Sequence, residues 1–271
     1  MTSIQLIAVD LDGTLLHDDE TLSPQGVSAL KKAVAMGVHV VIATGRRLAS
    51  ARQYAQQIGL SDPLIVVDGA QIASTPQGML WMEQVIPLHI AKQITRYADS
   101  QGWELTTVID STICYRQRPG QSVGNLADDC VVYNSNVEAV TAPPLRILAH
   151  EPEAIAGLEA YCQQLDHPDI RYQLFHHNNG MIRSICIFSG GADKGTALQF
   201  ICHKLNISPS QVLAIGDYDN DLSMFSVAGW SVAMGNAQDH IKAQSDMIAP
   251  TNEDGGVAWA VQEFVLRREG I

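Results

Sequence analysis

The sequence has few features of membrane, secreted or disulfide-stabilised proteins. It contains no run of about 18 apolar residues, the length that spans a bilayer, and its first lysine is Lys31, so a basic export signal is missing from its start. Its five cysteines lie far apart and form no C-x-x-C motif. We therefore expect a cytoplasmic protein without membrane contacts, whose cysteines are small buried side chains in a reducing compartment.

Several motifs of well-known enzyme classes are also absent. The sequence has no G-x-G-x-x-G for dinucleotides, no G-x-x-x-x-G-K-[ST] for nucleoside triphosphates and no G-x-S-x-G nucleophile turn. It has neither H-E-x-x-H nor a cluster of cysteine and histidine, as a zinc site would require. These absences argue against the corresponding cofactors and mechanisms.

Composition and charge narrow the class further. The 271 residues are 46% hydrophobic and 17% charged, which excludes a disordered chain. This length supports a large core and predicts between one and two domains. The net charge of −12 makes nucleic acid an unfavourable partner, and it admits an anionic substrate only beside local positive charge or a metal ion. We expect a monomer or a small homo-oligomer.

The first and last thirds of the chain share one pattern. Short apolar runs at Ile4–Val9, Val38–Ala43 and Leu64–Val67 alternate with amphipathic segments. The first helix is predicted to begin after Ser23 and to end at Gly37, with its apolar face formed by Val27, Leu30 and Val34. Strands that are apolar on both faces, separated by helices, predict a parallel sheet covered on both sides.

The middle of the chain follows a different pattern. Glu104–Ile109 and Ile113–Arg116 read as a hairpin, and predicted helices alternate with further strands, which indicates an antiparallel sheet in an α+β domain. For residues 117–144 we expect loops with room for one helix. The predicted fold is α/β: a doubly wound, Rossmann-like parallel-sheet core from 1–79 and 189–271, with an inserted α+β domain at 80–188.

Two carboxylates follow the first predicted strand. Asp10 and Asp12 are two residues apart, so in extended backbone they would face the same side. Ligands of open α/β sheets bind at the carboxyl ends of the strands. Taken alone, however, an acidic turn with two solvated carboxylates explains the pair equally well.

Other polar clusters fall at equivalent places. Thr44-Gly45-Arg46 follows the second strand, Asp217, Asn220 and Asp221 follow the strand at Val212–Ile215, and Lys194 opens a helix. Four carboxylates in one crevice would repel one another, and a divalent cation together with Lys194 would offset that repulsion. Because oxygen-only ligands favour magnesium, we expect Mg²⁺ there. A carboxylate in this setting can attack a phosphoryl group, and a second carboxyl can transfer the proton.

Four segments together resemble the motifs of the haloacid dehalogenase superfamily, and the insertion and Met234-Gly235-Asn236-Ala237 resemble its Cof-type sugar-phosphatase branch. The segments are Asp10-Leu11-Asp12-Gly13-Thr14-Leu15, Thr44-Gly45-Arg46, Asp193-Lys194-Gly195 and Gly216-Asp217-Tyr218-Asp219-Asn220-Asp221. The resemblance implies a Mg²⁺-dependent phosphoric monoester hydrolase acting on a small phosphorylated metabolite, with the inserted domain as its cap.

The resemblance also implies the role of each residue. Asp10 would be the nucleophile and Asp12 the general acid and base. The metal ligands would be Asp10, the Asp12 backbone carbonyl and Asp217, with Asp221 supporting the metal directly or through water. Thr44 and Lys194 would bind the phosphoryl oxygens, and Asn220 would help to place the phosphate or Lys194. Gly45 and Arg46 are further candidates for phosphate or substrate binding from their place in the second motif, although Arg46 could instead pair with surface acids.

Some readings stay open. Such relatives often carry Asn-Gly-Ala after the third strand, where this chain has Asp68-Gly69-Ala70; Asp68 would be a turn residue or an extra acid that alters substrate contacts, and we favour the turn. His176–Gly180 would be a hairpin turn, a substrate-reading loop or both. The same aspartyl-phosphate would also serve a phosphosugar mutase, and a receiver-like regulator uses similar residues, although receivers form a single compact domain.

Overall fold

The computed structural model describes residues 3–75, 77–116, 129–177 and 180–267. The chain forms two compact units, Met1–Met82 with Asp193–Ile271, and Glu83–Ala192. The first division lies three residues beyond the predicted boundary, and the reason is a hairpin: strands β4 (Gln71–Ala73) and β5 (Leu80–Glu83) are neighbours in one sheet. The turn between them therefore does not lead out of the first unit.

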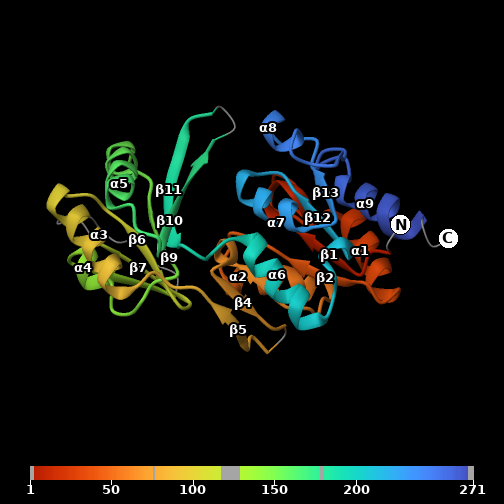
Figure 1. The fold of residues 1–271 in the computed structure, drawn as a ribbon, viewed down its shortest axis with the longest axis horizontal. Coiled ribbons are helices and arrows are strands. Elements are labelled where there is room, and N and C mark those ends of the chain that lie inside the picture. Colours follow the sequence, from red (N-terminus) through yellow and green to blue (C-terminus); the bar gives the residue numbers. More distant parts are fainter. Residues whose placement is uncertain (1–2, 76, 117–128, 178–179, 268–271) are drawn as a thin grey trace. The chain divides into compact units, whose positions relative to one another are not determined.

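The first unit is built on a five-stranded parallel sheet with the order β14-β13-β12-β1-β2 (Figure 1). Its strands are β1 (Leu6–Val9), β2 (His39–Ile42), β12 (Val212–Gly216), β13 (Trp230–Ala233) and β14 (Met247–Ile248). The chain proceeds outward in opposite directions from β1 and β12, which lie side by side. Such a switch point is where open α/β sheets bind ligands.

Helices cover this sheet. On one face, α6 (Lys194–Leu205), α7 (Leu222–Val227) and α8 (Asp239–Lys242) pack through a cluster that includes the β1 side chains Leu6 and Ala8. Helices α1 (Pro24–Ala35) and α9 (Gly256–Val261) contact each other, and α2 (Leu48–Ile58) contacts β3. Layers of helix and parallel sheet confirm the predicted doubly wound α/β fold.

The first helix begins as predicted, and its buried face includes Leu30 of the three predicted residues but not Val34. The Ser23 side chain accepts a hydrogen bond from the backbone N–H of Gly26, and Gly37 has a φ of 85° just beyond the helix end. Val34, however, is 39% exposed, so its place on the apolar face was wrong. The buried residues are Gly26, Ala29, Leu30 and Ala33.

The third predicted strand is shorter than expected and has different partners. Strand β3 (Leu64–Val66) joins β2 through one parallel bridge, Ala43 to Ile65, and otherwise pairs antiparallel with β4. It ends before Val67, which has a φ of 50° and so leaves the extended conformation. The turn that follows carries Asp68.

The second unit contains a six-stranded sheet with the order β10-β11-β9-β6-β7-β8, in which β7 and β8 run parallel and the other pairs antiparallel. Helices α3 and α5 pack on it around Ile90, Leu158 and Ile187. The elements are α3 (Leu88–Gln101), β6 (Thr106–Ile109), β7 (Thr112–Arg116), β8 (Cys130–Tyr133), α4 (Asn136–Ala139), β9 (Arg146–Ala149), α5 (Pro152–Leu165), β10 (Ile170–His176) and β11 (Ile182–Ser189).

Two predictions for this unit need comment. The expectation of loops at 117–144 missed strand β8, whose four residues are too few to show a pattern; residues 117–128 lie outside the described residues. At the predicted turn after His176, Gly180 has a φ of 81° and donates its N–H to the carbonyl oxygen of His177. Asn178 and Asn179 lie outside the described part of the chain.

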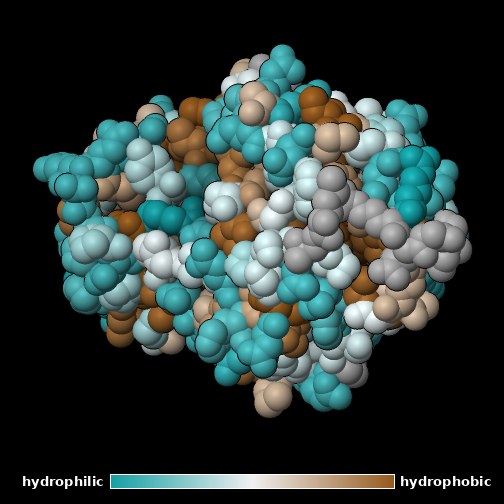
Figure 2. Space-filling model, turned by 45° about the vertical axis from the view of Figure 1, so that its right-hand side comes forward, coloured by the Kyte–Doolittle hydropathy of each residue, from teal (hydrophilic) through white to brown (hydrophobic). Residues whose placement is uncertain are grey.

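The surface shows no unusual grouping of described residues on the face that Figure 2 presents, and the cysteines form no disulfides. On the face in Figure 2, hydrophobic residues form small groups between hydrophilic ones. All five cysteines are free thiols, and four of them are buried. Among the described residues, we find no helix with the length and apolar character needed to cross a membrane.

Candidate active site

The predicted site residues lie at the switch point between β1 and β12. Asp10 directly follows β1, and its backbone N–H donates a hydrogen bond to the carbonyl oxygen of Ile215 in β12. Asp217 follows β12 itself. Two segments about 200 residues apart in sequence are thus adjacent because their parallel strands are neighbours.

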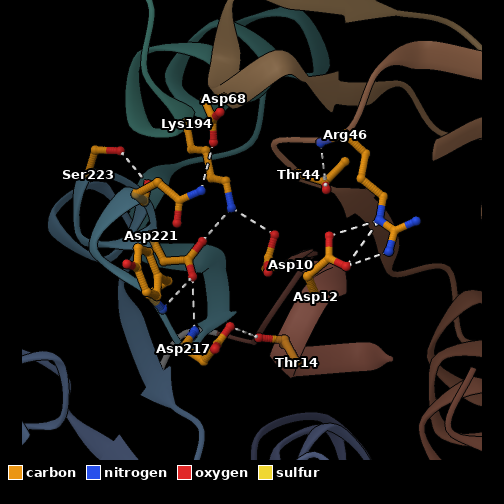
Figure 3. Close-up of polar contacts among 12 residues, drawn as sticks. Asp10, Asp12, Thr14, Thr44, Arg46, Asp68, Lys194, Asp217, Asp221 and Ser223 are labelled. Carbon is orange, nitrogen blue, oxygen red and sulfur yellow. Dashed lines mark hydrogen bonds and ion pairs between the residues drawn. The ribbon is translucent and has the colours of Figure 1, made fainter. Parts of the chain in front are cut away.

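Asp10, Lys194, Asp217 and Asp221 form what we call the inner site, and Lys194 is its cation (Figure 3). It is the first residue of α6 and is fully buried. Its Nζ lies 2.7 Å from Asp10 Oδ1 and 2.6 Å from Asp221 Oδ1. Burial opposes the charged form, but the carboxylates of Asp10, Asp221 and Asp68 outweigh it and raise the Lys194 pKa. Lys194 therefore stays protonated and ties Asp10 to Asp221.

Three carboxylates of the inner site crowd together. Ligand oxygens of Asp10, Asp217 and Asp221 all lie within 4.8 Å of one another. Burial raises the Asp10 pKa well above its usual range, and the charges of Asp221 and Asp217 add to the effect. Burial and then the charge of Asp221 raise the pKa of Asp217 to about 7. Such carboxylates are costly to ionise together without a compensating cation.

The backbone around the three carboxylates leaves no room for side chains. A Cβ on Gly13 would lie 2.3 Å from a carboxylate oxygen of Asp217, and one on Gly216 would lie 2.4 Å from Asp221 Oδ2. Thr14 donates its hydroxyl to Asp217 Oδ1 at 2.9 Å, while Asp221 Oδ2 accepts the backbone N–H groups of Asp217 and Tyr218. Each carboxylate is therefore held in one orientation.

This arrangement fits a divalent cation. The donors are oxygens only, and the raised pKa values of Asp10 and Asp217 show carboxylates in need of positive charge. Mg²⁺ prefers such oxygen ligands. We predicted that four carboxylates converge. Within the described residues, the group that could hold an ion contains three of them, Asp10, Asp217 and Asp221, and not Asp12.

The carboxylate of Asp12 instead pairs with Arg46, and we call these two residues the outer group. The strand ends before Asp10, and the backbone kinks within Leu11–Leu15, where Asp12 has φ and ψ of −72° and 121° and Gly13 has a φ of 73°. The Asp12 side chain is 54% exposed, whereas that of Asp10 is 8% exposed. The assumption that both carboxylates face the same way from a strand therefore does not hold beyond Asp10.

Arg46 is the cation of this outer group. It donates from Nε to Asp12 Oδ2 at 2.9 Å and from Nη2 to Asp12 Oδ1 at 2.6 Å. Nη2 also lies 3.4 Å from Glu20 Oε1, and the guanidinium carbon is 5.2 Å from the centre of the Tyr54 ring. Arg46, predicted to bind phosphate or substrate, here binds the carboxylate of Asp12.

The predicted phosphate-binding residues lie in two loops. Thr44 is fully buried after β2, and its hydroxyl oxygen accepts the backbone N–H of Arg46, so its own hydrogen can be donated to a ligand. Gly45 lies against Asp68: a Cβ there would be 3.0 Å from both carboxylate oxygens. Asn220 donates its Nδ2 to Asp68 Oδ1 at 2.7 Å.

The sequence analysis undervalued Asp68 and Thr14. Asp68 is 1% exposed and contacts site residues, so it is more than the turn residue that we favoured. Thr14 stands within the first motif but received no role. For Asp68 the departure from Asn was the available signal, whereas nothing in the sequence shows that Thr14 contacts Asp217.

Comparison with known proteins agrees with this geometry. Residues 7–261 match the model of the haloacid dehalogenase-like hydrolase family. The chain is 32% identical to the 5-amino-6-(5-phospho-D-ribitylamino)uracil phosphatase YitU of Bacillus subtilis over 97% of this chain and 98% of that protein. It is 28% identical to the pyridoxal phosphate phosphatase YbhA of Escherichia coli, over 97% of this chain and 99% of that protein.

Solved structures give the same result. A haloacid dehalogenase-like hydrolase from B. subtilis superimposes with a TM-score of 0.81 at 28% identity, covering 97% of this chain and all of the other. A Thermotoga maritima protein, TM0651, superimposes with a TM-score of 0.80 at 26% identity, over 96% of this chain and 97% of that chain. The resemblance of the four motifs is thereby confirmed, and this chain belongs to the haloacid dehalogenase-like hydrolases.

Proposed function

We propose that this protein is a Mg²⁺-dependent phosphatase that hydrolyses small phosphomonoesters through an aspartyl-phosphate on Asp10. The observation that carries the proposal is the inner site, in which the buried Lys194 joins Asp10 to Asp221 beside Asp217. Family membership and the phosphatase names of YitU and YbhA support it.

The inner site supplies the nucleophile and its surroundings. Asp10 would attack the phosphorus with the carboxylate oxygen that is not held by Lys194, and Lys194 keeps that side chain in one orientation. Mg²⁺, held by Asp10, Asp217, Asp221 and the backbone carbonyl of Asp12, would offset the charge of the phosphoryl oxygens. The Thr44 hydroxyl and the Gly45 N–H would bind those oxygens from the other side.

The outer group would supply the proton. Asp12 would protonate the leaving oxygen and then accept a proton from the water that attacks the phosphorus of the intermediate. Its exposure suits this task, because it must reach a leaving group that enters from solvent. Arg46 holds Asp12 through two nitrogens and would keep it ready beside the site.

The substrate class is a small phosphorylated metabolite. The relatives named above act on phosphoesters of a ribitylaminouracil and of pyridoxal, and sugar phosphates are the other natural group to test. The unit Glu83–Ala192 would serve as the cap that selects the leaving group. The net charge of −12 keeps nucleic acid an unfavourable partner.

A phosphate-release screen tests the proposal. The purified chain is incubated with sugar phosphates, pyridoxal phosphate and the phosphoribitylamino-uracil, each with Mg²⁺ and with a chelator. We expect release of inorganic phosphate from at least one compound, and only with the metal. Release without an added acceptor separates hydrolysis from mutase activity, and no release from any compound would contradict the proposal.

A further inference from the structure

Asp68 lies on a strained turn that the fold holds in place by hydrogen bonds. Val67, Asp68 and Gly69 have φ angles of 50°, 53° and 89°. A positive φ is unfavourable for any residue with a side chain, and most of all for the β-branched Val67. The turn is tied to the loop after β2, because Val67 donates its N–H to the carbonyl oxygen of Arg46 and Asp68 donates its own to that of Thr44.

The strained turn delivers a buried carboxylate to a second loop. Asp68 is 1% exposed, and its Oδ1 accepts a hydrogen bond of 2.7 Å from Asn220 Nδ2. A carboxylate can only accept, so the amide nitrogen of Asn220 has to face Asp68. The Oδ1 of Asn220 is then buried with no donor within hydrogen-bond reach in the described part of the chain, which is a further cost.

Asn220 stands in the turn that carries two of the candidate metal ligands. It lies between Asp217 and Asp221, and its carbonyl oxygen accepts the hydroxyl of Ser223 at 3.3 Å. Ser223 Oγ in turn accepts the backbone N–H of Gly195, the residue after Lys194. A bond to Asn220 therefore braces the turn that holds Asp217 and Asp221.

We propose that Asp68 is a positioning residue that fastens the metal-binding turn at 217–221 to the phosphate-binding loop at 44–46 through its hydrogen bond with Asn220. The proposal rests on the proposed function for the roles of the two loops. The positive φ angles of Val67 and Asp68 and the unsatisfied Oδ1 of Asn220 both reduce stability. That the fold keeps both features at the same place indicates that the bond between Asp68 and Asn220 has a functional role.

Two variants separate the hydrogen bond from the charge of Asp68. Asp68→Ala removes both, while Asp68→Asn removes the charge but keeps an oxygen that accepts from Asn220. We expect Asp68→Ala to weaken Mg²⁺ binding about fivefold by calorimetry and to raise KM about tenfold with kcat changed less than about threefold. Asp68→Asn should stay within about twofold of wild type in all three quantities.

The partner variant completes a double-mutant cycle. In the Asn220→Ala background, Asp68→Ala should change Mg²⁺ affinity by less than about 1.5-fold, because the residue through which it acts is gone. Equal effects in both backgrounds, or an Asp68→Asn as deficient as Asp68→Ala, would overturn the proposal. Thermal unfolding midpoints show whether Asp68→Ala is folded. If it is not, the proposal is tested by the other two variants: Asn220→Ala should weaken Mg²⁺ binding and Asp68→Asn should not.

The cycle also distinguishes failure of this inference from failure of the proposed function. Mg²⁺ calorimetry needs no turnover, so coupling between Asp68 and Asn220 is measurable even if no phosphomonoester is hydrolysed. Absence of phosphate release by the wild type would count against the proposed function alone. Additive Mg²⁺ affinities in an active enzyme would count against the role of Asp68 alone.

Discussion

The inner and outer parts of the site place two aspartates in opposite environments. Asp10 is buried and held by the buried Lys194, whereas Asp12, two residues later, is half-exposed and held by Arg46. The difference comes from the backbone, which leaves the extended conformation after Asp10. One short motif therefore presents a fixed, buried carboxylate and an accessible one, as the proposed nucleophile and proton donor would require.

The largest expected effect comes from the inner carboxylate itself. Asp10→Asn keeps the shape of the side chain but removes the nucleophile, so phosphate release should fall by roughly a thousandfold or more. The unfolding midpoint should not fall, because the variant relieves the repulsion among three crowded carboxylates while Lys194 keeps Asp221 as its partner. Asp239→Asn, on the exposed first turn of α8, is the matched control and should keep full activity; comparable activity in both variants would contradict the role of Asp10.

Loss of the inner cation should affect both activity and stability. Lys194→Ala leaves Asp10 and Asp221 without their buried partner, which costs about 3–5 kcal/mol of unfolding free energy when one member of a buried ion pair is removed. Activity should fall roughly a hundredfold. Denaturant unfolding measures the first effect, and Lys204→Ala, an exposed lysine on the same helix, serves as the control. An unfolding free energy equal to that of the control would refute the central place of Lys194.

The outer group should matter less and in a different way. Arg46→Ala leaves Asp12 without its bidentate partner, so we expect kcat to fall roughly thirtyfold with little change in stability. Arg46→Lys keeps the charge but loses the fork, and it should recover only part of the rate. If Arg46→Ala raised KM and left kcat unchanged, Arg46 would bind substrate, as the motif alone suggests, instead of orienting Asp12.

The smallest change needs no mutation, only a change of pH. The pKa of Asp217 is raised to about 7, so below that pH a proton competes with the metal, and Mg²⁺ affinity should fall about tenfold per pH unit. Without metal, the folded state binds more protons than the unfolded state between about pH 4 and 7, so its stability should decrease as pH rises through that range. Calorimetry and denaturant unfolding check both, and a flat Mg²⁺ affinity from pH 5 to 8 would argue against Asp217 as a ligand.

The sequence predicted the inner part of the site well because its geometry follows from the strands. Asp10, Asp217 and Lys194 stand at strand ends or a helix start, and parallel strands bring such positions together wherever they lie in the chain. The outer part depends on side-chain directions that sequence spacing does not determine, which is why the partner of Arg46 and the direction of Asp12 were missed. Asp68 was undervalued because the sequence shows only its departure from the common Asn, and neither its left-handed backbone nor its contact with Asn220 follows from that departure.

The inserted unit shows the same limit at a larger scale. Its first hairpin was predictable from periodicity, and β6 and β7 pair as that prediction requires. No motif there marks a chemical role, so the sequence offered no candidate residues for the proposed selection of a leaving group. The sequence analysis missed strand β8 in this unit. This strand has four residues, and its pairing with β7 depends on contacts between segments distant in the sequence.

The most direct test of the account is mass spectrometry of the enzyme after rapid acid quench during turnover of a substrate found in the screen. We predict a phosphoryl group on the peptide that contains Asp10 in the wild type, and none on the same peptide of Asp10→Asn. Steady turnover without covalent phosphate at Asp10, or undiminished turnover by Asp10→Asn, would contradict the claim that the inner carboxylate is the nucleophile.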